Sequence, residues 1–437
     1  MSKLLRTLAL FALLVAMGTL CNFAACLIDT PAMRQNAAQG ARMLADQGSQ
    51  PELVGGFSSA RLDNFTAVLI LKTAAYTGPE SLPMRALGGM RTDMLAPEGA
   101  DLWNQWYAFC EVADGSQSPT GVGLSYSRYW HGTMLPLRLL LCVLNLSNIQ
   151  MLLYFAQLAL LLLTALLMQR RGLTRLLPGF AAAYFLMMPG AMGVCLQYAP
   201  VSLITLAACC AVLAWHDQLH CAVGLPGFFA LVGLVTNYFD LLTFPLVSLG
   251  FPLVLSLCIR LCGESPDTRG LPRLILHAIA CCAAWGVGYG GMWAIKWLFT
   301  ALFLGPQWLA GVGEQAMLRL SSGGGEGLAA RLDAMRLNIA VISDKTAYRL
   351  LLPFVAMLTA ACTAFRIGRL RRDGFGTRFD FRVLALLIPA ALPFAWMLVM
   401  ANHVADHYYY TYRILAFAAL AAYALLAYAL APDKKKT

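Results

Sequence analysis

Three polar stretches of this sequence carry side chains whose types and spacing suit chemistry. The stretch from Asn402 to Arg413 holds two histidines, one aspartate, four tyrosines and one arginine in twelve residues. On a continuous helix His403 and His407 would share one face, because residues four apart lie one turn above each other. Anion binding by these side chains is the functional interpretation, and a solvated loop is the simpler one. Metal ligation by His403, Asp406 and His407 is a further alternative.

The second stretch, YSRYWHG at 126–132, packs Arg128 and His131 among aromatic residues. Tyrosine and tryptophan are common at the headgroup level of membranes simply as anchors, which accounts for the aromatic residues alone. The guanidinium of Arg128 presents a fork of donors that fits phosphate oxygens, and an aromatic face such as that of Tyr129 suits stacking on a sugar ring. We expect Arg128, Tyr129 and His131 to bind a phosphorylated lipid that carries a sugar.

The third stretch, RLDNFT at 61–66, precedes an apolar segment that an interfacial helix would explain. Asp63 then has two interpretations, as an N-cap of that helix or as a base that accepts a proton from a substrate hydroxyl. Arg61 and Asn64 flank it and are candidate substrate ligands. Asp240, at the outer end of an apolar run, joins them, because ionisable groups near membrane depth usually face a cavity or a partner.

The elements that position these residues are expected to be membrane helices. The chain has 437 residues, of which 59% are hydrophobic and 12% charged, and its mean hydropathy is +0.65. Soluble domains carry about twice that charged fraction, and a membrane-crossing helix needs about 20 apolar residues. We therefore predict an all-α polytopic membrane protein. Ten spans are expected, at 4–28, 148–168, 176–193, 195–215, 221–239, 241–259, 274–301, 348–365, 383–401 and 413–431.

Two details of this span prediction remain open. The runs 176–193 and 195–215 are joined by almost nothing, so one of them can be a broken helix. The apolar segment 132–146 is short and contains Arg138, which favours an interfacial or re-entrant helix over a span.

The basic residues predict the orientation of the bundle. With both termini on the inner side, the short inner connections hold 17 of the 32 lysines and arginines, as the positive-inside rule requires. The net charge of +10 is thus explained by topology, and nucleic-acid binding is not expected. In one integral-membrane domain, 1–437, this leaves a first extracytoplasmic loop at 28–147 with interfacial helices and a second at 302–347.

Metal and disulfide motifs are scarce. Most of the 13 cysteines fall inside expected spans, where they act as small packing residues, and no CxxC pattern occurs. His216 and His220 have i, i+4 spacing, but this pair by itself is not expected to bind a metal. A divalent metal is the one cofactor that the sequence leaves open.

The topology, with an inside N-terminus, one span, a long outer loop and many closely packed spans, resembles the GT-C superfold of integral-membrane glycosyltransferases. The motifs LDNFT, YSRYWHG, TNYFDLLT and NHVADHYYYTYR resemble a group of uncharacterised bacterial membrane proteins close to that superfold. In the GT-C superfold the first outer loop carries interfacial helices and an acidic base, and the donor is a polyprenyl-phosphate-linked sugar. Asp63 matches the base by position. The chain departs from the pattern in having Asn64 where many members have a second acidic residue.

The resemblance implies inverting glycosyl transfer at the outer face of a bacterial inner membrane, to a cell-envelope glycan, lipid or protein. Asp63 would be the base, while Arg128 and Arg413, with His403 or His407, would hold the departing phosphate. The rival interpretations are a transporter or flippase of a lipid-linked glycan, a surface-polysaccharide polymerase or ligase, and a membrane acyltransferase. A single site further requires Asp63, Arg128 and His403 to converge on one outward cavity.

Overall fold

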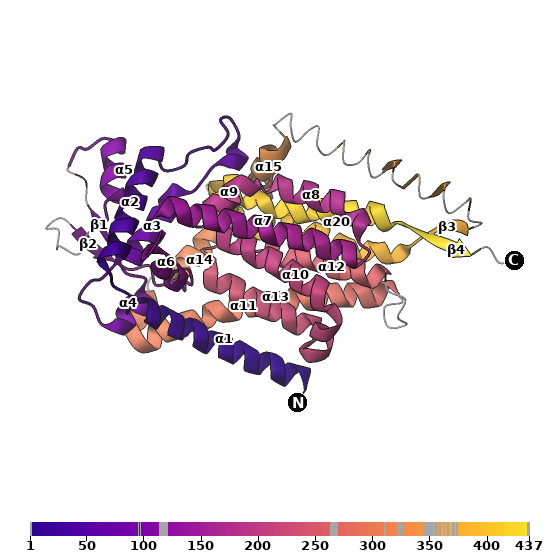
Figure 1. Ribbon diagram of the computed structural model, residues 1–437, viewed down its shortest axis with the longest axis horizontal. Helices are drawn as coiled ribbons and strands as arrows, with labels where there is room; N and C mark the ends of the chain where they lie inside the picture. The colour runs from indigo at the N-terminus through magenta and orange to yellow at the C-terminus, as the bar shows by residue number, and fades with distance from the viewer. Residues whose placement is uncertain are drawn as a thin grey trace.

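A bundle of long helices, capped at one end by shorter helices and a two-stranded sheet, makes up the computed structural model (Figure 1). The structure describes residues 2–94, 96, 98–112, 121–262, 270–309, 312–321, 327–343, 375–434 and isolated residues between 353 and 372. Within this part, six helical segments are long and apolar enough to cross a membrane. The predicted class, an all-α polytopic membrane protein, is confirmed to that extent.

The bundle consists of α1 (Lys3–Ala25), α7 (Leu146–Arg170), α8 (Leu177–Leu186), α9 (Pro189–Val194), α10 (Ala199–Ala222), α11 (Gly224–Phe239), α12 (Val247–Cys262), α13 (Leu271–Leu304), α17 (Leu387–Val399) and α20 (Leu415–Tyr428). The cap that follows α1 consists of α2 (Pro31–Gln47), α3 (Asn64–Ala75), α4 (Leu82–Gly88), α5 (Leu102–Cys110), α6 (Met134–Leu141) and the antiparallel strands β1 (Arg91–Met94) and β2 (Gly121–Leu124). The later elements are α14 (Val312–Leu320), α15 (Gly327–Ser343), α18 (Ala401–Asp406), α19 (Tyr408–Thr411) and the antiparallel strands β3 (Phe375–Phe379) and β4 (Leu430–Lys434). Short 3-10 turns lie at Ser58–Ala60, Thr174–Leu176, Pro306–Leu309, Phe381–Leu386 and Tyr412–Ile414.

The expected count of ten spans is matched only in part. Of the two runs 176–193 and 195–215, the first is broken between α8 and α9, where Met188 has a φ of 57° and Pro189 opens the next helix. The 16-residue helices α11 and α12 are shorter than the six long segments. The segment 132–146 contains the eight-residue α6, which is too short to span. The expected span 348–365 lies outside the continuously described residues.

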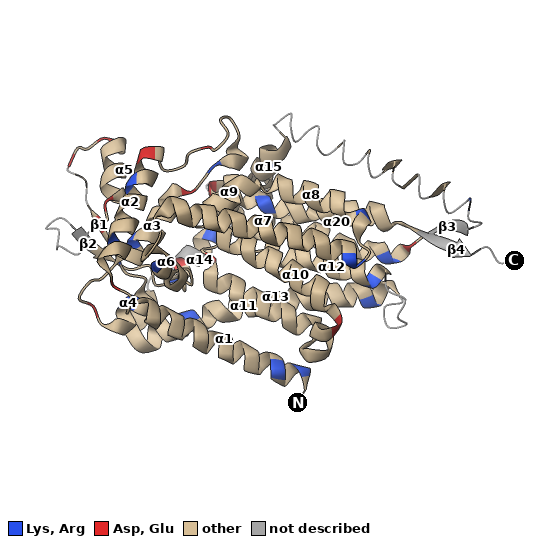
Figure 2. Cartoon of the chain, in the orientation of Figure 1, with Lys and Arg blue, Asp and Glu red and all other residues tan. Residues whose placement is uncertain are grey.

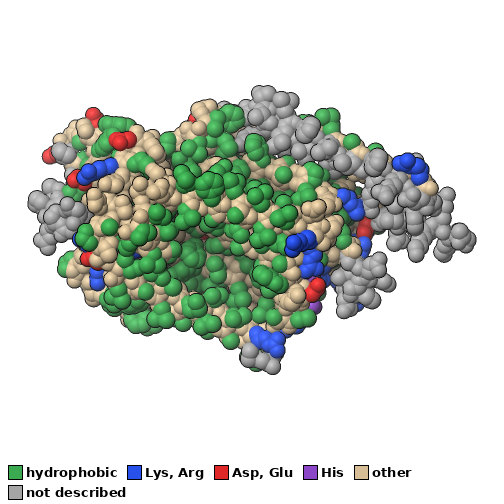
Figure 3. Space-filling model, in the orientation of Figure 1, with side chains coloured by type: hydrophobic (Ala, Val, Ile, Leu, Met, Phe, Trp, Pro, Cys, Tyr) green, Lys and Arg blue, Asp and Glu red, His purple; other side chains and the backbone are tan. Residues whose placement is uncertain are grey.

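The two ends of the bundle differ in charge and in composition. The start of α1 and strand β4 lie at one end, and α2 to α6 lie at the other (Figure 1). Lysine and arginine residues lie at both ends of the bundle, whereas most of the acidic residues lie at the end of α2 to α6 (Figure 2). Hydrophobic side chains cover most of the flank between the ends (Figure 3). This distribution agrees with an inner position for both termini, which remains a prediction.

Close packing of α11 against α13 builds one wall of the bundle. A Cβ atom on Gly288 would lie 1.9 Å from the carbonyl oxygen of Ala230, and one on Gly233 would lie 2.2 Å from that of Trp285. The two backbones therefore touch at these glycines, as small residues allow in membrane helix pairs. This contact fixes α13, which contributes aromatic residues to the site described below.

A buried arginine joins the cap to the bundle. Arg138 of α6 donates to the carbonyl oxygens of Ala25 at 2.8 Å and of Tyr76 at 2.7 Å, near the C-terminal ends of α1 and α3. It also donates to Ile28 at 3.2 Å and Thr73 at 3.4 Å. Helix C-termini carry unpaired carbonyl groups and a partial negative charge. Arg138 therefore satisfies two such ends at once, which explains an arginine inside an apolar segment.

Candidate functional site

The arginine pocket lies at the cap end of α13 and has a volume of about 140 Å³. It is lined by Arg128, Tyr129, Leu242, Trp293, Trp297, Val312, Arg319, Leu320 and Met400. The indole rings of Trp293 and Trp297 stack with centroids 5.7 Å apart. Three separate parts of the chain, 126–132, α13 and α14, thus bring two guanidinium groups and three large aromatic side chains together.

The pocket offers hydrogen-bond donors without matching acceptors. Among the described residues, no carboxylate lies within ion-pair distance of Arg128 or Arg319. The Nε atom of Arg128 and the Nε1 atom of Trp293 are buried without a hydrogen-bond partner. Arg128 is held by Tyr126, whose hydroxyl it approaches at 3.2 Å and whose ring lies 4.6 Å below the guanidinium. Buried donors are normally satisfied, so an anionic ligand is the natural complement of this pocket.

Arg319 was not singled out by the sequence, where it is one arginine in a polar outer loop. In the structure its Nη1 atom donates to Nδ1 of His403 at 3.1 Å. Burial, and then the nearby His407 and Arg319, hold the pKa of His403 well below its usual value. A neutral His403 therefore accepts from Arg319 and reaches the pocket through it, since it is not itself a lining residue.

His131 supports the backbone next to the pocket. Its Nε2 atom lies 2.9 Å from the carbonyl oxygen of Tyr126, and its φ is 54°. Burial lowers the pKa of His131 to about 4, so the ring is neutral at pH 7. The neighbouring Trp130 anchors the same turn by donating to the carbonyl oxygen of Met292 at 2.8 Å. His131 thus has a structural contact here, and its predicted part in binding a phosphorylated lipid stays a prediction.

The chain segments 129–133 and 238–242 cross beside the pocket. The backbone N–H of Gly132 donates to the carbonyl oxygen of Tyr238 at 3.0 Å. A Cβ atom on Gly132 would lie 2.4 Å from the Tyr238 ring, so only glycine fits. Leu242 lines the pocket with a φ of 64°, a conformation that costs about 1 kcal/mol or more for a non-glycine residue.

Asp240 holds this crossing in place and is not a lining residue of the arginine pocket. Its Oδ1 atom accepts the backbone N–H of Thr243 at 2.9 Å and the Thr243 hydroxyl at 2.6 Å. Its Oδ2 atom accepts the hydroxyl of Tyr289 at 2.9 Å. Tyr289 of α13 thus supplies a partner for the buried carboxylate of Asp240. The position of Asp240 is therefore explained without a substrate.

Asp63 is the N-cap of α3, as one of its two interpretations predicts. Oδ1 accepts the backbone N–H of Thr66 at 2.9 Å, and Oδ2 accepts the Thr66 hydroxyl at the same distance. The side chain is buried, and burial raises the pKa of its carboxyl. A carboxylate has about four acceptor positions, so two remain for another donor.

The neighbours of Asp63 also have structural partners. Arg61 lies 3.3 Å from Oε1 of Glu52 and 5.4 Å from the Tyr409 ring centroid. Asn64 donates to the carbonyl oxygen of Gly48 at 3.0 Å. Neither residue lines the arginine pocket.

Arg413 is a correction to the predicted site. Its side chain is fully buried and donates to the carbonyl oxygens of Met187 at 2.8 Å, Ser59 at 3.0 Å and Tyr409 at 3.2 Å. These bonds join α8, the cap and α19, and the guanidinium lies 4.6 Å from the Tyr198 ring centroid. It is therefore enclosed by protein and has no access to a phosphate.

His407 packs beside the pocket residues without entering the pocket. Its ring stacks on Tyr410 with centroids 5.0 Å apart, and it meets the His403 ring edge-on at 4.8 Å. Burial lowers the pKa of His407 to about 4. The imidazole is therefore neutral at pH 7 where no anion lies beside it, and its predicted part in holding a phosphate stays a prediction.

The predicted convergence of Asp63, Arg128 and His403 is met only for the last two, which Arg319 connects. Asp63 lies at the other side of an aromatic row. The Tyr198 hydroxyl approaches the carbonyl oxygen of Arg61 at 3.5 Å, the Tyr198 ring packs on Tyr410 at 5.7 Å, and Tyr410 packs on His403 at 6.2 Å.

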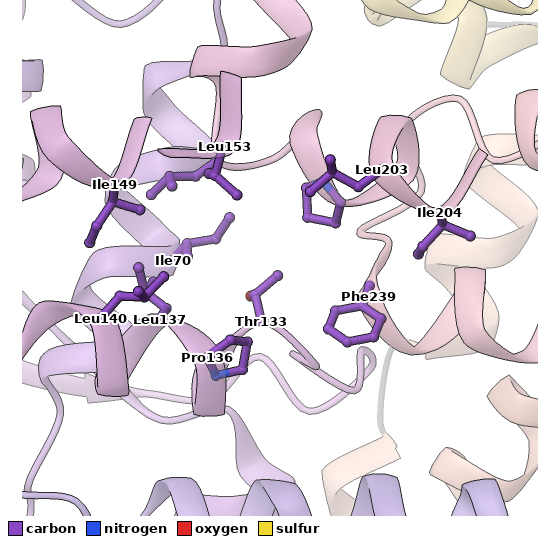
Figure 4. A pocket seen from close by; sticks show the side chains of 12 residues that line it. Ile70, Thr133, Pro136, Leu137, Leu140, Ile149, Leu153, Leu203, Ile204 and Phe239 are labelled. Carbon is purple, nitrogen blue, oxygen red and sulfur yellow. The ribbon is translucent and has the colours of Figure 1, made fainter. Parts of the chain in front are cut away.

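A second cavity, of about 320 Å³, is almost entirely apolar. It is lined by Ile70, Thr133, Pro136, Leu137, Leu140, Ile149, Leu153, Leu196, Pro200, Leu203, Ile204 and Phe239. Figure 4 shows side chains from α6, α7, α10 and α11 surrounding the empty space. The flank is hollowed in the same region, between α7 and α11 (Figure 3). Thr133 and Phe239 belong to the two segments that cross at Gly132, so this apolar cavity and the arginine pocket adjoin the same crossing.

Metal binding finds no support among the described residues. No group of three histidine, cysteine, aspartate or glutamate side chains there is close enough to hold an ion. His216 instead lies 3.3 Å from the carboxylate of Asp217.

Comparison with known proteins gives no family assignment. No protein-family model, curated protein or solved structure matches the chain. The likeness to the GT-C superfold stays an expectation from the sequence.

Proposed function

We propose that this protein transfers a sugar from a polyprenyl-phosphate-linked donor to a hydroxyl group of a cell-envelope acceptor, at the extracytoplasmic face of a bacterial inner membrane. The observation that carries the proposal is the arginine pocket. Arg128 and Arg319 provide two guanidinium groups without carboxylate partners among the described residues. Guanidinium groups bind phosphate oxygens in a bidentate manner, and the stacked indoles offer faces for an attached sugar.

The apolar cavity supports a lipid-linked donor over a soluble one. It adjoins the crossing at Gly132 from the side of Thr133 and Phe239, while Tyr129 and Leu242 face the arginine pocket. An amphiphile would place its phosphate with the arginines and its chain among the leucines and isoleucines. Each buried methylene of such a chain contributes about 0.8 kcal/mol, so several isoprene units would add substantially to affinity.

The reaction is a direct displacement at the sugar carbon. The acceptor oxygen attacks that carbon, a new carbon–oxygen bond forms, and the bond to the phosphate oxygen breaks with its electron pair leaving on the phosphate. Arg128 and Arg319 neutralise the charge that develops there. Asp63 is the candidate for the base that takes the proton of the acceptor hydroxyl, because its pKa is raised and two of its acceptor positions remain. Asp63 lies across the row of Tyr198, Tyr410 and His403 from the arginine pocket, so this role requires the acceptor to reach the donor from that side. A single displacement inverts the configuration of the sugar carbon.

A specific observation favours transfer over transport of the lipid-linked glycan. A transport path needs ionisable groups within the bilayer, and two such side chains in the spans, Lys296 and His277, already have partners. Lys296 donates to the carbonyl oxygen of Leu87, and Nε2 of His277 lies 3.2 Å from the hydroxyl of Ser256. A polymerase or ligase of surface polysaccharide would use the same site with a longer acceptor.

The experiment that tests the proposal follows the fate of the lipid. The purified protein is reconstituted into vesicles with polyprenyl-phosphate hexoses and candidate acceptors, and free polyprenyl phosphate is measured. The wild type should release it, whereas the double variant Arg128→Ala/Arg319→Ala should not. Arg336→Ala is the matched control, because Arg336 is an exposed arginine of the second outer loop. Movement of intact donor across the vesicle without cleavage would contradict the proposal and identify a transporter.

A further inference from the structure

One of the two arginines that line the pocket, Arg319, needs a partner that holds its side chain in place. Arg319 lies near the end of α14, a short helix whose side chains at Met317 and Leu318 are largely exposed. An arginine on such an element loses rotamer freedom when it is held in one place, at a cost of up to about 2 kcal/mol. Something must therefore hold its guanidinium over the pocket before a ligand arrives.

The structure provides one side-chain hydrogen bond of this kind, from Nη1 of Arg319 to Nδ1 of His403 at 3.1 Å. A guanidinium has donors only, so Nδ1 must be the acceptor. His403 is then the neutral tautomer with its proton on Nε2. This assignment follows from the chemistry of arginine alone.

The surroundings of His403 fix its ring. Trp396 meets it edge-on with centroids 5.9 Å apart, His407 does so at 4.8 Å, and Tyr410 packs at 6.2 Å. The backbone of Leu242 lies against it as well. The titratable and charged groups that face His403 are thus Arg319, His407 and Tyr410, and none of them is a carboxylate. A ring fixed on all sides presents its acceptor nitrogen in one direction.

The backbone of α14 is attached to the same segment. The N–H of Asn402 donates to the carbonyl oxygen of Ser321 at 3.0 Å, and Arg331 donates to that of Leu320 at 3.0 Å. The helix itself is therefore held near α18 and α15 without His403. Replacing the imidazole should release the Arg319 side chain while α14 stays in place.

We propose that His403 is a positioning residue, which holds Arg319 over the arginine pocket so that two guanidinium groups meet one phosphate. The inference rests on the proposed function for the identity of the anion. It changes the role predicted for His403 from the sequence, because the imidazole acts on the ligand through Arg319 and carries no charge of its own.

The test measures binding of farnesyl phosphate, with farnesol as the uncharged reference, to the purified full-length protein in a nonionic detergent. His403→Leu should weaken farnesyl phosphate binding about tenfold. His403→Asn should bind within about twofold of the wild type, because its amide oxygen can take the place of Nδ1. In the Arg319→Ala background, His403→Leu should cause no further loss. That absence of an additional effect separates positioning through Arg319 from a direct contact.

The pH profile is an independent readout. In acid, protonation of His403 removes the acceptor and places a second positive charge beside Arg319, so wild-type affinity should fall. His403→Asn cannot be protonated and should lose the part of the fall that His403 causes. A role of His403 in packing alone would leave the profile of His403→Asn parallel to that of the wild type.

Each outcome assigns the failure to one proposal. If Arg128→Ala and Arg319→Ala weaken binding but His403→Leu does not, or if His403→Leu is equally harmful without Arg319, then the positioning role is wrong and the phosphate site stands. If the wild type binds farnesyl phosphate no better than farnesol, the phosphate site is wrong, and the function proposed above fails with it.

Discussion

Oδ1 of Asp63 accepts the backbone N–H of Thr66, and Oδ2 accepts the hydroxyl of the same residue, both at 2.9 Å. The carboxylate thus starts α3 and keeps acceptor positions free on each oxygen. Capping explains why an aspartate lies at this position, and it also explains how its orientation is fixed. A base with a fixed orientation is what general-base catalysis requires, so the two roles are compatible.

Substitution of Asp63 separates these roles. Asp63→Asn should keep the cap, because asparagine is as good an N-cap as aspartate, and should abolish sugar transfer because an amide takes no proton. Asp63→Ala should lose transfer and also about 1 kcal/mol of stability. Release of polyprenyl phosphate and the apparent Tm in detergent are measured in parallel. Transfer at the wild-type rate by Asp63→Asn would show that Asp63 serves only as the N-cap of α3 and not as the base.

The contact of α11 with α13 predicts different effects at two glycines that lie on opposite faces of α13. Gly288→Ala places a Cβ atom 1.9 Å from the carbonyl oxygen of Ala230, so the helices must separate, at a cost of about 1–3 kcal/mol. Gly286→Ala meets nothing within 4 Å and should be neutral or stabilising by up to about 1 kcal/mol through helix propensity. Thermal unfolding followed by tryptophan fluorescence compares the two. An equal Tm for both variants would contradict the close approach.

The apolar cavity predicts a dependence on chain length. Leu203→Trp should fill part of the cavity and weaken farnesyl phosphate binding about tenfold, while binding of butyl phosphate, which barely reaches the cavity, should not change. Leu162→Trp is the control, because Leu162 is 66% exposed on α7 and lines neither pocket. Equal losses for the long and the short phosphate would show that the chain lies elsewhere.

Acid should destabilise the cap end through its buried histidines. Burial lowers the pKa of His131 to about 4, whereas an unfolded histidine titrates near 6.5. Between these values the unfolded chain binds more protons, so the free energy of unfolding rises with pH and is lost as the pH falls from about 6.5 towards 4.

The check is the slope of apparent Tm against pH over that window. His131→Asn should give a shallower slope, and asparagine tolerates the positive φ at this position. A wild-type slope in His131→Asn would show that His131 titrates equally in both states.

The sequence alone determined the class of the protein and the ends of several elements, because these follow from local patterns. Runs of about 20 apolar residues predict membrane helices wherever the partners lie. The short α6 and the N-cap at Asp63 depend on neighbours within a few residues. The polar stretches that hold Arg128 and His403 also stood out locally, against an apolar background.

The tertiary structure alone decided which of these side chains can meet a ligand. Nothing in the sequence distinguishes Arg413 from Arg319. In the structure Arg413 donates to carbonyl oxygens of distant segments, whereas Arg319 lines a pocket beside Arg128. His403 and Arg319 are 84 positions apart. The availability of a donor depends on which acceptors the fold brings within 3 Å of it, and those partnerships join residues that no local pattern connects.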